Sequence, residues 1–290
     1  MLNKTTLEKS INDTANYSSM NLGPDIFSAF FQFFEIPLTI IALLLILIVP
    51  VIVIYLFLRL SETAFEQIGF DHWHAVIAIF GSIIGSLVDI PLSLGPITSY
   101  PGWFLTLTSG LGSYPTSFNP FYLAINLGGA IVPMILSIEL LVRGRVSALR
   151  AGIGMLIVAV ITYLFAMPVA NEGITLPFWL PPVLAAIVAL LLNRGYDKAP
   201  ALAYISGSMG TLIGADIFNL LTPGVLPALS PPGSSSRALV LSIGGAGVFD
   251  GIFLTGILAV LFAAGIVCLF HGSCEGVVMH RHNKTRKIGP

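Results

Sequence analysis

Charge is scarce in this 290-residue chain. Only 9% of its residues are charged, 13 of them basic and 14 acidic, whereas a soluble domain carries about 25%. The hydrophobic fraction is 56% and the mean hydropathy is +0.93. No charged residue occurs at the 49 positions between Asp89 and Glu139. This composition excludes an ordinary water-soluble globular protein and predicts a multi-pass protein of the cell membrane.

Cysteine and the common catalytic motifs are scarce or absent as well. Two cysteines are too few for a disulfide framework or a cysteine-built metal cage. A net charge of −1, without a basic patch interleaved with aromatic residues, argues against nucleic acid as a partner. Walker-type loops, dinucleotide fingerprints, His-Glu-x-x-His and Gly-x-Ser-x-Gly do not occur. We therefore expect no cofactor, no metal and no nucleotide or serine-hydrolase chemistry.

Long apolar segments dominate the chain instead. About 20 apolar residues in a helix cross a hydrocarbon core of about 30 Å, and seven segments qualify. They are 37–60, 74–94, 122–142, 148–168, 176–193, 200–221 and 238–270. We predict an all-α, polytopic transmembrane bundle over residues 37–270, with a tail over 1–36 and a basic tail over 271–290. The oligomeric state stays open.

Two segments outside these spans have distinctive compositions. Pro24–Ile36 is rich in phenylalanine, which predicts an interfacial helix on the outer surface. An extension of the first span, interrupted at Pro37, is the alternative. Residues 95–121 are uncharged and rich in glycine, proline and aromatics, which favours a re-entrant segment or an outer lid over a solvated linker.

The basic residues predict the orientation, because lysine and arginine near span ends favour the cytoplasmic side. With the N-terminus outside and the C-terminus inside, ten basic residues lie inside and three outside. The inner set is Arg59, Arg143, Arg145, Arg150, Arg194, Lys198, Arg281, Lys284, Arg286 and Lys287, and the outer set is Lys4, Lys9 and Arg237. The opposite orientation would reverse this bias.

Three acidic residues fall inside predicted spans: Asp89, Asp216 and Asp250. An ionised carboxylate near the bilayer centre costs at least about 2.5 to 3.5 kcal/mol, so such a residue indicates a functional site. The 33-residue seventh span is too long for one straight helix, and its glycines over Ser242–Gly247 predict a break that leaves Asp250 at the start of the inner half-helix. The structural alternatives are an N-cap for Asp250, an interface position for Asp89 and an interhelical contact for Asp216.

The sixth span carries a stripe of glycines as well. Gly207, Gly210 and Gly214 share one helix face and allow a neighbouring helix to approach closely. If the seventh span is that neighbour, Asp216 and Asp250 lie near each other. Further polar or flexible positions that would surround this site are Asn126, Asn219, Gly245 and Gly247.

Four segments resemble a family of archaeal and bacterial multi-pass membrane proteins defined as a domain of unknown function. They are Asn126–Pro133, Pro181–Ala186, Ala199–Asp216 and Ser242–Gly256, and the resemblance extends over most of the chain from the second span onward. It implies a membrane location and no particular activity.

A local resemblance to intramembrane aspartyl proteases of the presenilin and signal peptide peptidase type concerns the two acids on consecutive spans. Asp216 is on the sixth span, Asp250 follows Gly245-Ala-Gly247 on the seventh, and Pro200-Ala-Leu202 is present. The resemblance implies a catalytic dyad of Asp216 and Asp250. Two residues separate Asp250 from Gly247, and Pro-Ala-Leu precedes both acids, where that family has it after them.

Three functions follow from these patterns. The first is an intramembrane aspartyl protease with a transmembrane-helix substrate, in which two carboxylates share a proton and activate water. The second is a proton- or ion-coupled transporter or channel for a small solute, because transporters bind ions at broken helices. The third is a non-catalytic scaffold subunit.

Two remaining clusters have simpler interpretations. Asp71-His72-Trp73-His74 is typical of an interfacial tryptophan with polar neighbours, because histidines two apart point to different sides of a helix. Glu139 and Arg143 are spaced for an i,i+4 ion pair.

Overall fold

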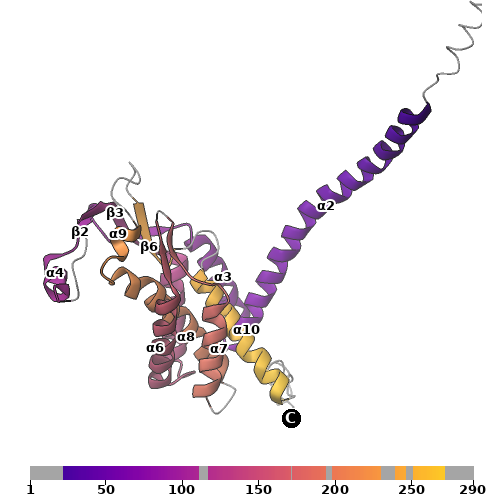
Figure 1. The fold of residues 1–290 in the computed structure, drawn as a ribbon. Helices are drawn as coiled ribbons and strands as arrows, with labels where there is room; N and C mark the ends of the chain where they lie inside the picture. Colours follow the sequence, from indigo (N-terminus) through magenta and orange to yellow (C-terminus); the bar gives the residue numbers. More distant parts are fainter. Residues whose placement is uncertain are drawn as a thin grey trace, which may run out of the picture. The chain divides into compact units, whose positions relative to one another are not determined.

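The computed structural model describes residues 22–110, 117–170, 172–193, 198–229, 239–245 and 251–271, with side chains between residues 38 and 269 of these ranges, apart from Ser117, Phe118 and Leu239. The chain forms two compact units, Met1–Phe57 and Leu58–Pro290. The described part of the first unit is the beginning of α2 (Leu22–Gln67), a long helix (Figure 1) with mostly exposed apolar side chains from residue 38 onward.

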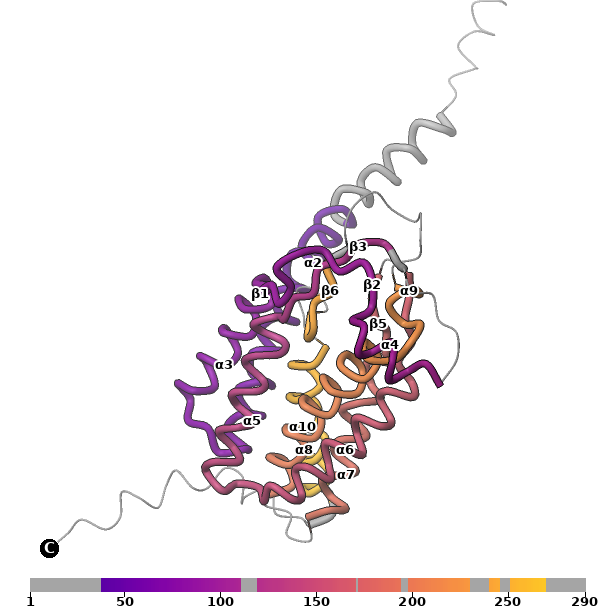
Figure 2. The backbone as a smooth tube through the Cα atoms, turned by 90° about the vertical axis from the view of Figure 1, so that its left-hand side faces the viewer, coloured from indigo at the N-terminus to yellow at the C-terminus, as the bar shows by residue number. Residues whose placement is uncertain are grey.

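Six helices of the second unit lie side by side as a bundle (Figure 2). They are α3 (His72–Gly85), α5 (Val132–Val142), α6 (Ala148–Phe165), α7 (Leu180–Leu192), α8 (Ala199–Thr211) and α10 (Gly251–His271). Among the described residues, two π-helical turns interrupt the regular geometry: η1 (Leu127–Ile131) leads into α5, and η3 (Leu212–Phe218) continues α8.

In the part of the chain that the structure describes, four apolar helices are long enough to cross a membrane: Leu38–Gln67, Ala148–Phe165, Ala199–Phe218 and Gly251–Leu269. Three shorter apolar helices are His72–Gly85, Leu127–Val142 and Leu180–Leu192. Each of these seven helices overlaps one predicted span. The prediction of a mostly helical protein is therefore confirmed, and several of its helices are long and apolar enough to span a membrane.

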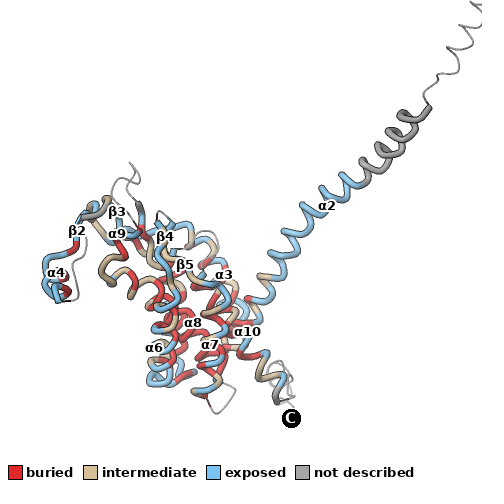
Figure 3. The backbone as a smooth tube through the Cα atoms, viewed as in Figure 1, coloured by how far each residue is buried: buried red, intermediate tan, exposed pale blue. Residues whose placement is uncertain are grey.

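The centre of the bundle is α8. Every residue of this helix is buried (Figure 3), as expected of a helix that is apolar or small on all sides. Gly207 approaches Ala185 of α7 and Ala259 of α10, whereas Gly210 approaches Val158 of α6. The small residues therefore let α8 pack closely against three neighbours.

A four-stranded sheet lies at one end of the bundle (Figure 2). Its strands are β1 (Asp89–Pro91), β2 (Ile97–Ser99), β3 (Ser117–Asn126) and β6 (Leu239–Ile243), and β4 (Met167–Val169) pairs separately with β5 (Gly173–Thr175). β1 and β2 run antiparallel to β3, while β6 runs parallel to it with Ile243 opposite Ile125. Ala124 and Ile125 pair with both β1 and β6, so these two strands lie on opposite edges of β3.

The all-α prediction is wrong at this end of the molecule. The predicted spans 74–94 and 238–270 contain β1 and β6, and the predicted span 122–142 begins within β3. β3 and β6 are rich in aromatic and β-branched residues, which favour strands, and a short apolar run does not by itself distinguish a strand from a buried helix. The predicted break in the seventh span is confirmed, because β6 ends at Ile243 and α10 begins at Gly251.

Two other predicted segments differ in detail. α2 continues through Pro37 without interruption, so the structure has one helix where the sequence indicated a break. Residues 95–121 contain β2, the short helix α4 (Gly102–Thr108) and the start of β3. Together with α9 (Val225–Leu229), this segment contributes to an apolar cluster that includes Tyr100, Phe104 and Leu226. Its depth relative to the membrane stays a prediction.

Close backbone contact holds α3 against η1. A Cβ on Gly128 would overlap the backbone of Ser82 and Ser86, while one on Gly81 would meet nothing within 4 Å. We expect Gly128→Ala to destabilise the protein by about 1 to 3 kcal/mol and Gly81→Ala to be neutral or stabilising by up to about 1 kcal/mol. Thermal unfolding in detergent measures both, and equal melting temperatures for the two variants would contradict the close approach.

Candidate functional site

Asn126, at the junction of β3 and η1, binds three neighbours at once. It is 2% exposed. Its side-chain oxygen accepts a hydrogen bond from the N–H of Gly129 at 2.9 Å, which caps η1. Its amide nitrogen donates to the carbonyl oxygen of Ser86 at 2.9 Å and to Oδ1 of Asp89 at 3.0 Å. Asn126 thus satisfies backbone groups that a chain break between helices leaves open.

Asp89 connects this junction to the break in the seventh predicted span. The same Oδ1 that accepts from Asn126 also accepts from the hydroxyl of Ser242 at 2.5 Å. Asp89 itself is exposed. Hydrogen bonds to a carboxylate are stronger than neutral ones, so the side chains of Asp89, Asn126 and Ser242 tie together the ends of β1, β3 and β6.

Asp216 reaches the same turn from η3. Its Oδ2 accepts a hydrogen bond from the backbone N–H of Gly244 at 2.6 Å. η3 packs closely on α6, because a Cβ on Gly214 would overlap Ala159, and Asn219 satisfies the carbonyl of Gly214 through a 3.2 Å hydrogen bond from its amide. π-helical turns are rare in proteins, and those that occur frequently lie at functional sites. Such a turn is the local irregularity that carries Asp216.

Gly244 is required at its position. Its φ is +76°, which lies in the left-handed region that favours glycine. A Cβ there would be 2.7 Å from the Cβ and 2.8 Å from the backbone nitrogen of Ala130. Ser242 and Gly244 are two residues apart in the same turn. This turn therefore binds both acids: the hydroxyl of Ser242 donates to Asp89, and the backbone N–H of Gly244 donates to Asp216.

Two adjoining cavities share Asp216 in their walls. The strand-side cavity, of about 410 Å³, is also lined by Glu172 and Ser242. The helix-side cavity, of about 300 Å³, is also lined by Thr211 and Thr255. Ile174, Thr175 and Gly245 line both cavities. Among the described lining residues of the two cavities, the charged side chains are those of Glu172 and Asp216, and none is a lysine, arginine or histidine.

One buried hydroxyl in this region is unsatisfied. Thr211 is 5% exposed, and its Oγ1 has no hydrogen-bond partner among the described residues. The hydroxyl of Thr255, by contrast, donates to the carbonyl of Gly251 at 2.6 Å. A buried polar group without a partner is costly, so a small ligand or water in the helix-side cavity would satisfy Thr211.

Basic residues gather at the other end of the bundle. Arg143 forms the ion pair with Glu139 that the sequence predicts, and its guanidinium lies 5.2 Å from the centre of the Phe70 ring. Arg150, at the start of α6, donates to the side chain of Asn193, just after α7, at 2.8 Å. These contacts join the α2–α3 corner, the α5–α6 turn and the end of α7, all remote from the sheet.

The predicted site residues are thus only partly placed together. Asp89 and Asn126 bind each other, Asp216 binds the turn that contains Gly244 and Gly245, and Asn219 caps η3 without lining either cavity. Asp250 and Gly247 lie outside the described residues. So do Lys4, Lys9, Arg194, Arg237 and the basic residues from Arg281 onward.

The glycine stripe of the sixth span contacts α6 as well as the helix of the seventh predicted span. Gly210 and Gly214 face α6, and only Gly207 touches α10. The contact of Asp216 with the broken seventh span is made instead through Gly244. Sequence reasoning missed Ser242, Glu172 and Thr211. Ser242 begins the glycine-rich break, which was a usable signal, but nothing in the sequence pattern brings Glu172 and Thr211 to the same acid.

The apolar helices and the polar junction between broken segments define the class of this molecule: a helical membrane protein with a carboxylate site at one end of its bundle. Residues 83–262, well over half of the chain, match the family described as "Protein of unknown function (DUF1614)", and the chain belongs to this family. No curated protein and no solved structure matches it. The family match includes Asp89, Asn126 and Asp216.

Proposed function

We propose that the protein is a cell-membrane transporter of a small solute, coupled to a proton or a monovalent cation that binds at Asp216. The observation that carries this proposal is the position of Asp216 in the wall common to two adjoining cavities. Secondary transporters bind ions where helices are interrupted. A scaffold subunit needs no cavity beside an acid, so the cavities favour transport over that alternative.

The charge of the cavity walls supports a cationic ligand. Glu172 and Asp216 line the strand-side cavity without a basic residue among its described walls. In a medium of low dielectric constant a carboxylate without a counter-charge is expensive, so it either takes up a proton or binds a cation. The hydroxyls of Thr175 and Thr211 add neutral oxygen ligands next to Asp216 in the helix-side cavity.

The turn at Gly244 supplies an element that can couple binding to movement. Its N–H is bonded to Asp216, while Ser242 is bonded to Asp89. Protonation or cation binding weakens a hydrogen bond that the ionised carboxylate accepts, which releases the turn from η3. Movement of this turn changes the wall that the two cavities share, because Gly245 lines both of them.

We further propose seven crossings, with the N-terminus outside and the C-terminus in the cytoplasm. The strand directions support this alternation: β1 follows α3 and is antiparallel to β3, whereas β3 and β6 are parallel and lead into α5 and α10. If every intervening helix crosses, the third and seventh spans run in the same direction, as these strands do. The basic end of the bundle then faces the cytoplasm.

Cysteine labelling tests this orientation. In a background without Cys268 and Cys274, Ser147→Cys at the exposed α5–α6 turn is expected to react with a membrane-impermeant maleimide only after permeabilisation of cells. Ser109→Cys, near the sheet end, is expected to react in intact cells. The reverse pattern would contradict the proposed orientation.

The aspartyl protease is a second candidate, favoured by one contact. Gly244, which is bonded to Asp216, lies six residues before Asp250 in the chain, and this limits the separation of the two acids. The dyad remains a proposal, because Asp250 lies outside the described residues. Cleavage of a reporter transmembrane helix that is lost in both Asp216→Asn and Asp250→Asn would favour the protease over the transporter.

Reconstitution into liposomes tests the transport proposal. The full chain is expected to conduct sodium or protons when a panel of small amines and other solutes is added to one side, as measured by radiolabelled sodium and by a pH-sensitive dye. Flux no greater than that of empty liposomes under every gradient would contradict transport.

A further inference from the structure

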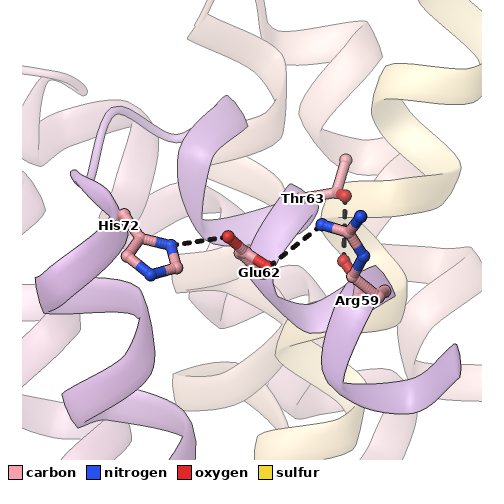
Figure 4. A network of polar contacts seen from close by, with 4 residues as sticks. All are labelled: Arg59, Glu62, Thr63 and His72. Carbon is pink, nitrogen blue, oxygen red and sulfur yellow. Dashed lines mark hydrogen bonds and ion pairs between the residues drawn. The ribbon is translucent and has the colours of Figure 1, made fainter. Parts of the chain in front are cut away.

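A second cluster of metal-binding side chains lies at the basic end of the bundle, outside the family match, and Figure 4 shows two of its members, Glu62 and His72. Glu62 and Glu66 are one helical turn apart at the end of α2, so their carboxylates share a face. His72 begins α3. The ligand atoms of these three residues lie within 4.8 Å of one another. We name Glu62, Glu66 and His72 the corner cluster.

The backbone fixes the corner cluster through a Schellman motif at the end of α2. The N–H of Gly69 donates to the carbonyl of Glu66 at 3.0 Å, and the N–H of Phe70 donates to the carbonyl of Phe65 at 3.0 Å. Gly69 has φ +96°, which is usual for the glycine of this motif, and the rings of Phe65 and Phe70 meet edge to face at 5.9 Å, a hydrophobic contact that frequently accompanies it. Both rings are buried, so the corner that turns His72 back toward α2 is well packed.

We propose that the corner cluster binds a divalent transition-metal ion, zinc in first place. Two carboxylates and one imidazole are a donor set that zinc uses, with water in the fourth position. Tetrahedral zinc places its ligand atoms about 3.4 Å apart, which the exposed side chains of Glu66 and His72 and the partly exposed side chain of Glu62 reach by small rotations. Nδ1–H of His72 donates to Oε1 of Glu62 at 2.6 Å, and the metal ion takes the place of the proton between them.

The neighbouring charges are compatible with this site. Arg59 lies 3.7 Å from the other oxygen of Glu62 and is 65% exposed, and an ion pair of this kind contributes little. Asp71 and His74 form a separate pair, in which the hydrogen bond from His74 holds the pKa of Asp71 below its ordinary value. His74 is therefore a matched control: a histidine two residues from His72 that does not belong to the corner cluster.

Zinc titration of the full chain in detergent tests the site, in a background with His271→Gln, His280→Gln and His282→Gln that removes the three histidines of the C-terminal tail. One zinc ion per chain is expected. Glu66→Gln and His72→Gln are each expected to weaken binding by at least about tenfold, whereas His74→Gln retains the parent affinity. The side chain of Glu66 is exposed and forms no hydrogen bond or ion pair with the described residues, so Glu66→Gln is expected to melt like the parent chain.

X-ray absorption at the zinc edge provides the second readout and is expected to show one imidazole among oxygen ligands. Parent-like binding in both Glu66→Gln and His72→Gln would overturn the proposal. So would an equal loss in His74→Gln, a spectrum without imidazole, or magnesium binding as tight as zinc binding.

Discussion

Asp216→Asn is expected to abolish cation-coupled flux while the protein still folds. Asparagine keeps an oxygen that accepts the hydrogen bond from Gly244, so we expect a change in stability of no more than about 1 kcal/mol. It cannot take up a proton or neutralise a cation, and the cavities on both sides of this residue hold no other described acid except Glu172. Liposome flux should therefore fall to the background of empty vesicles.

Glu172→Gln is the control for this prediction. Glu172 is exposed and lines only the strand-side cavity, so its removal should weaken apparent solute affinity but leave coupling intact. If coupled flux survives in Asp216→Asn, Asp216 does not bind the coupling ion. If flux is lost equally in Glu172→Gln, Asp216 alone is not the coupling site, and Glu172 in the strand-side cavity takes part in coupling.

Gly244→Ala is expected to destabilise the protein and disconnect Asp216 from the seventh predicted span. An alanine in the left-handed region costs about 1 to 2 kcal/mol, and overlap of its Cβ with Ala130 adds about 1 to 3 kcal/mol. The N–H at this position would move away from Asp216, so flux should fall even in the folded fraction.

The matched variant for Gly244→Ala is Gly265→Ala on α10, where a Cβ meets nothing within 4 Å. Apparent melting temperature in detergent and liposome flux are measured for both. If Gly244→Ala melts and conducts like Gly265→Ala, the turn at Gly244 is not the constrained element described above.

The sequence predicted the helical part of the fold because its signal is the length of apolar runs. The fourth span, predicted over 148–168, corresponds to α6 at Ala148–Phe165. The prediction from sequence failed where the backbone N–H and C=O groups form hydrogen bonds with a segment far away in the chain. β3 and β6 pair with each other across more than a hundred residues of chain, and no local pattern distinguishes such strands from the beginnings of helices.

The candidate site shows the same division. Acidic residues within apolar segments are conspicuous in a sequence, so the sequence indicates Asp89 and Asp216 together with Asn126. Their partners are set by tertiary contacts: Ser242 is 153 residues from Asp89, and Gly244 is 28 residues from Asp216. The corner cluster was also missed, because His72 was considered with Asp71 and His74 along the chain, whereas its partner Glu62 lies on the preceding helix.

Carbodiimide modification of Asp216 tests the central claim most directly. An apolar carbodiimide reacts with a protonated carboxyl in an apolar site, and peptide mass spectrometry locates the adduct. The account predicts an adduct on Asp216 that forms more slowly when the coupling cation occupies the site. It also predicts slower formation at higher pH, because the carboxyl group then loses its proton. No adduct on Asp216, or a rate indifferent to pH and to every cation tested, would contradict it.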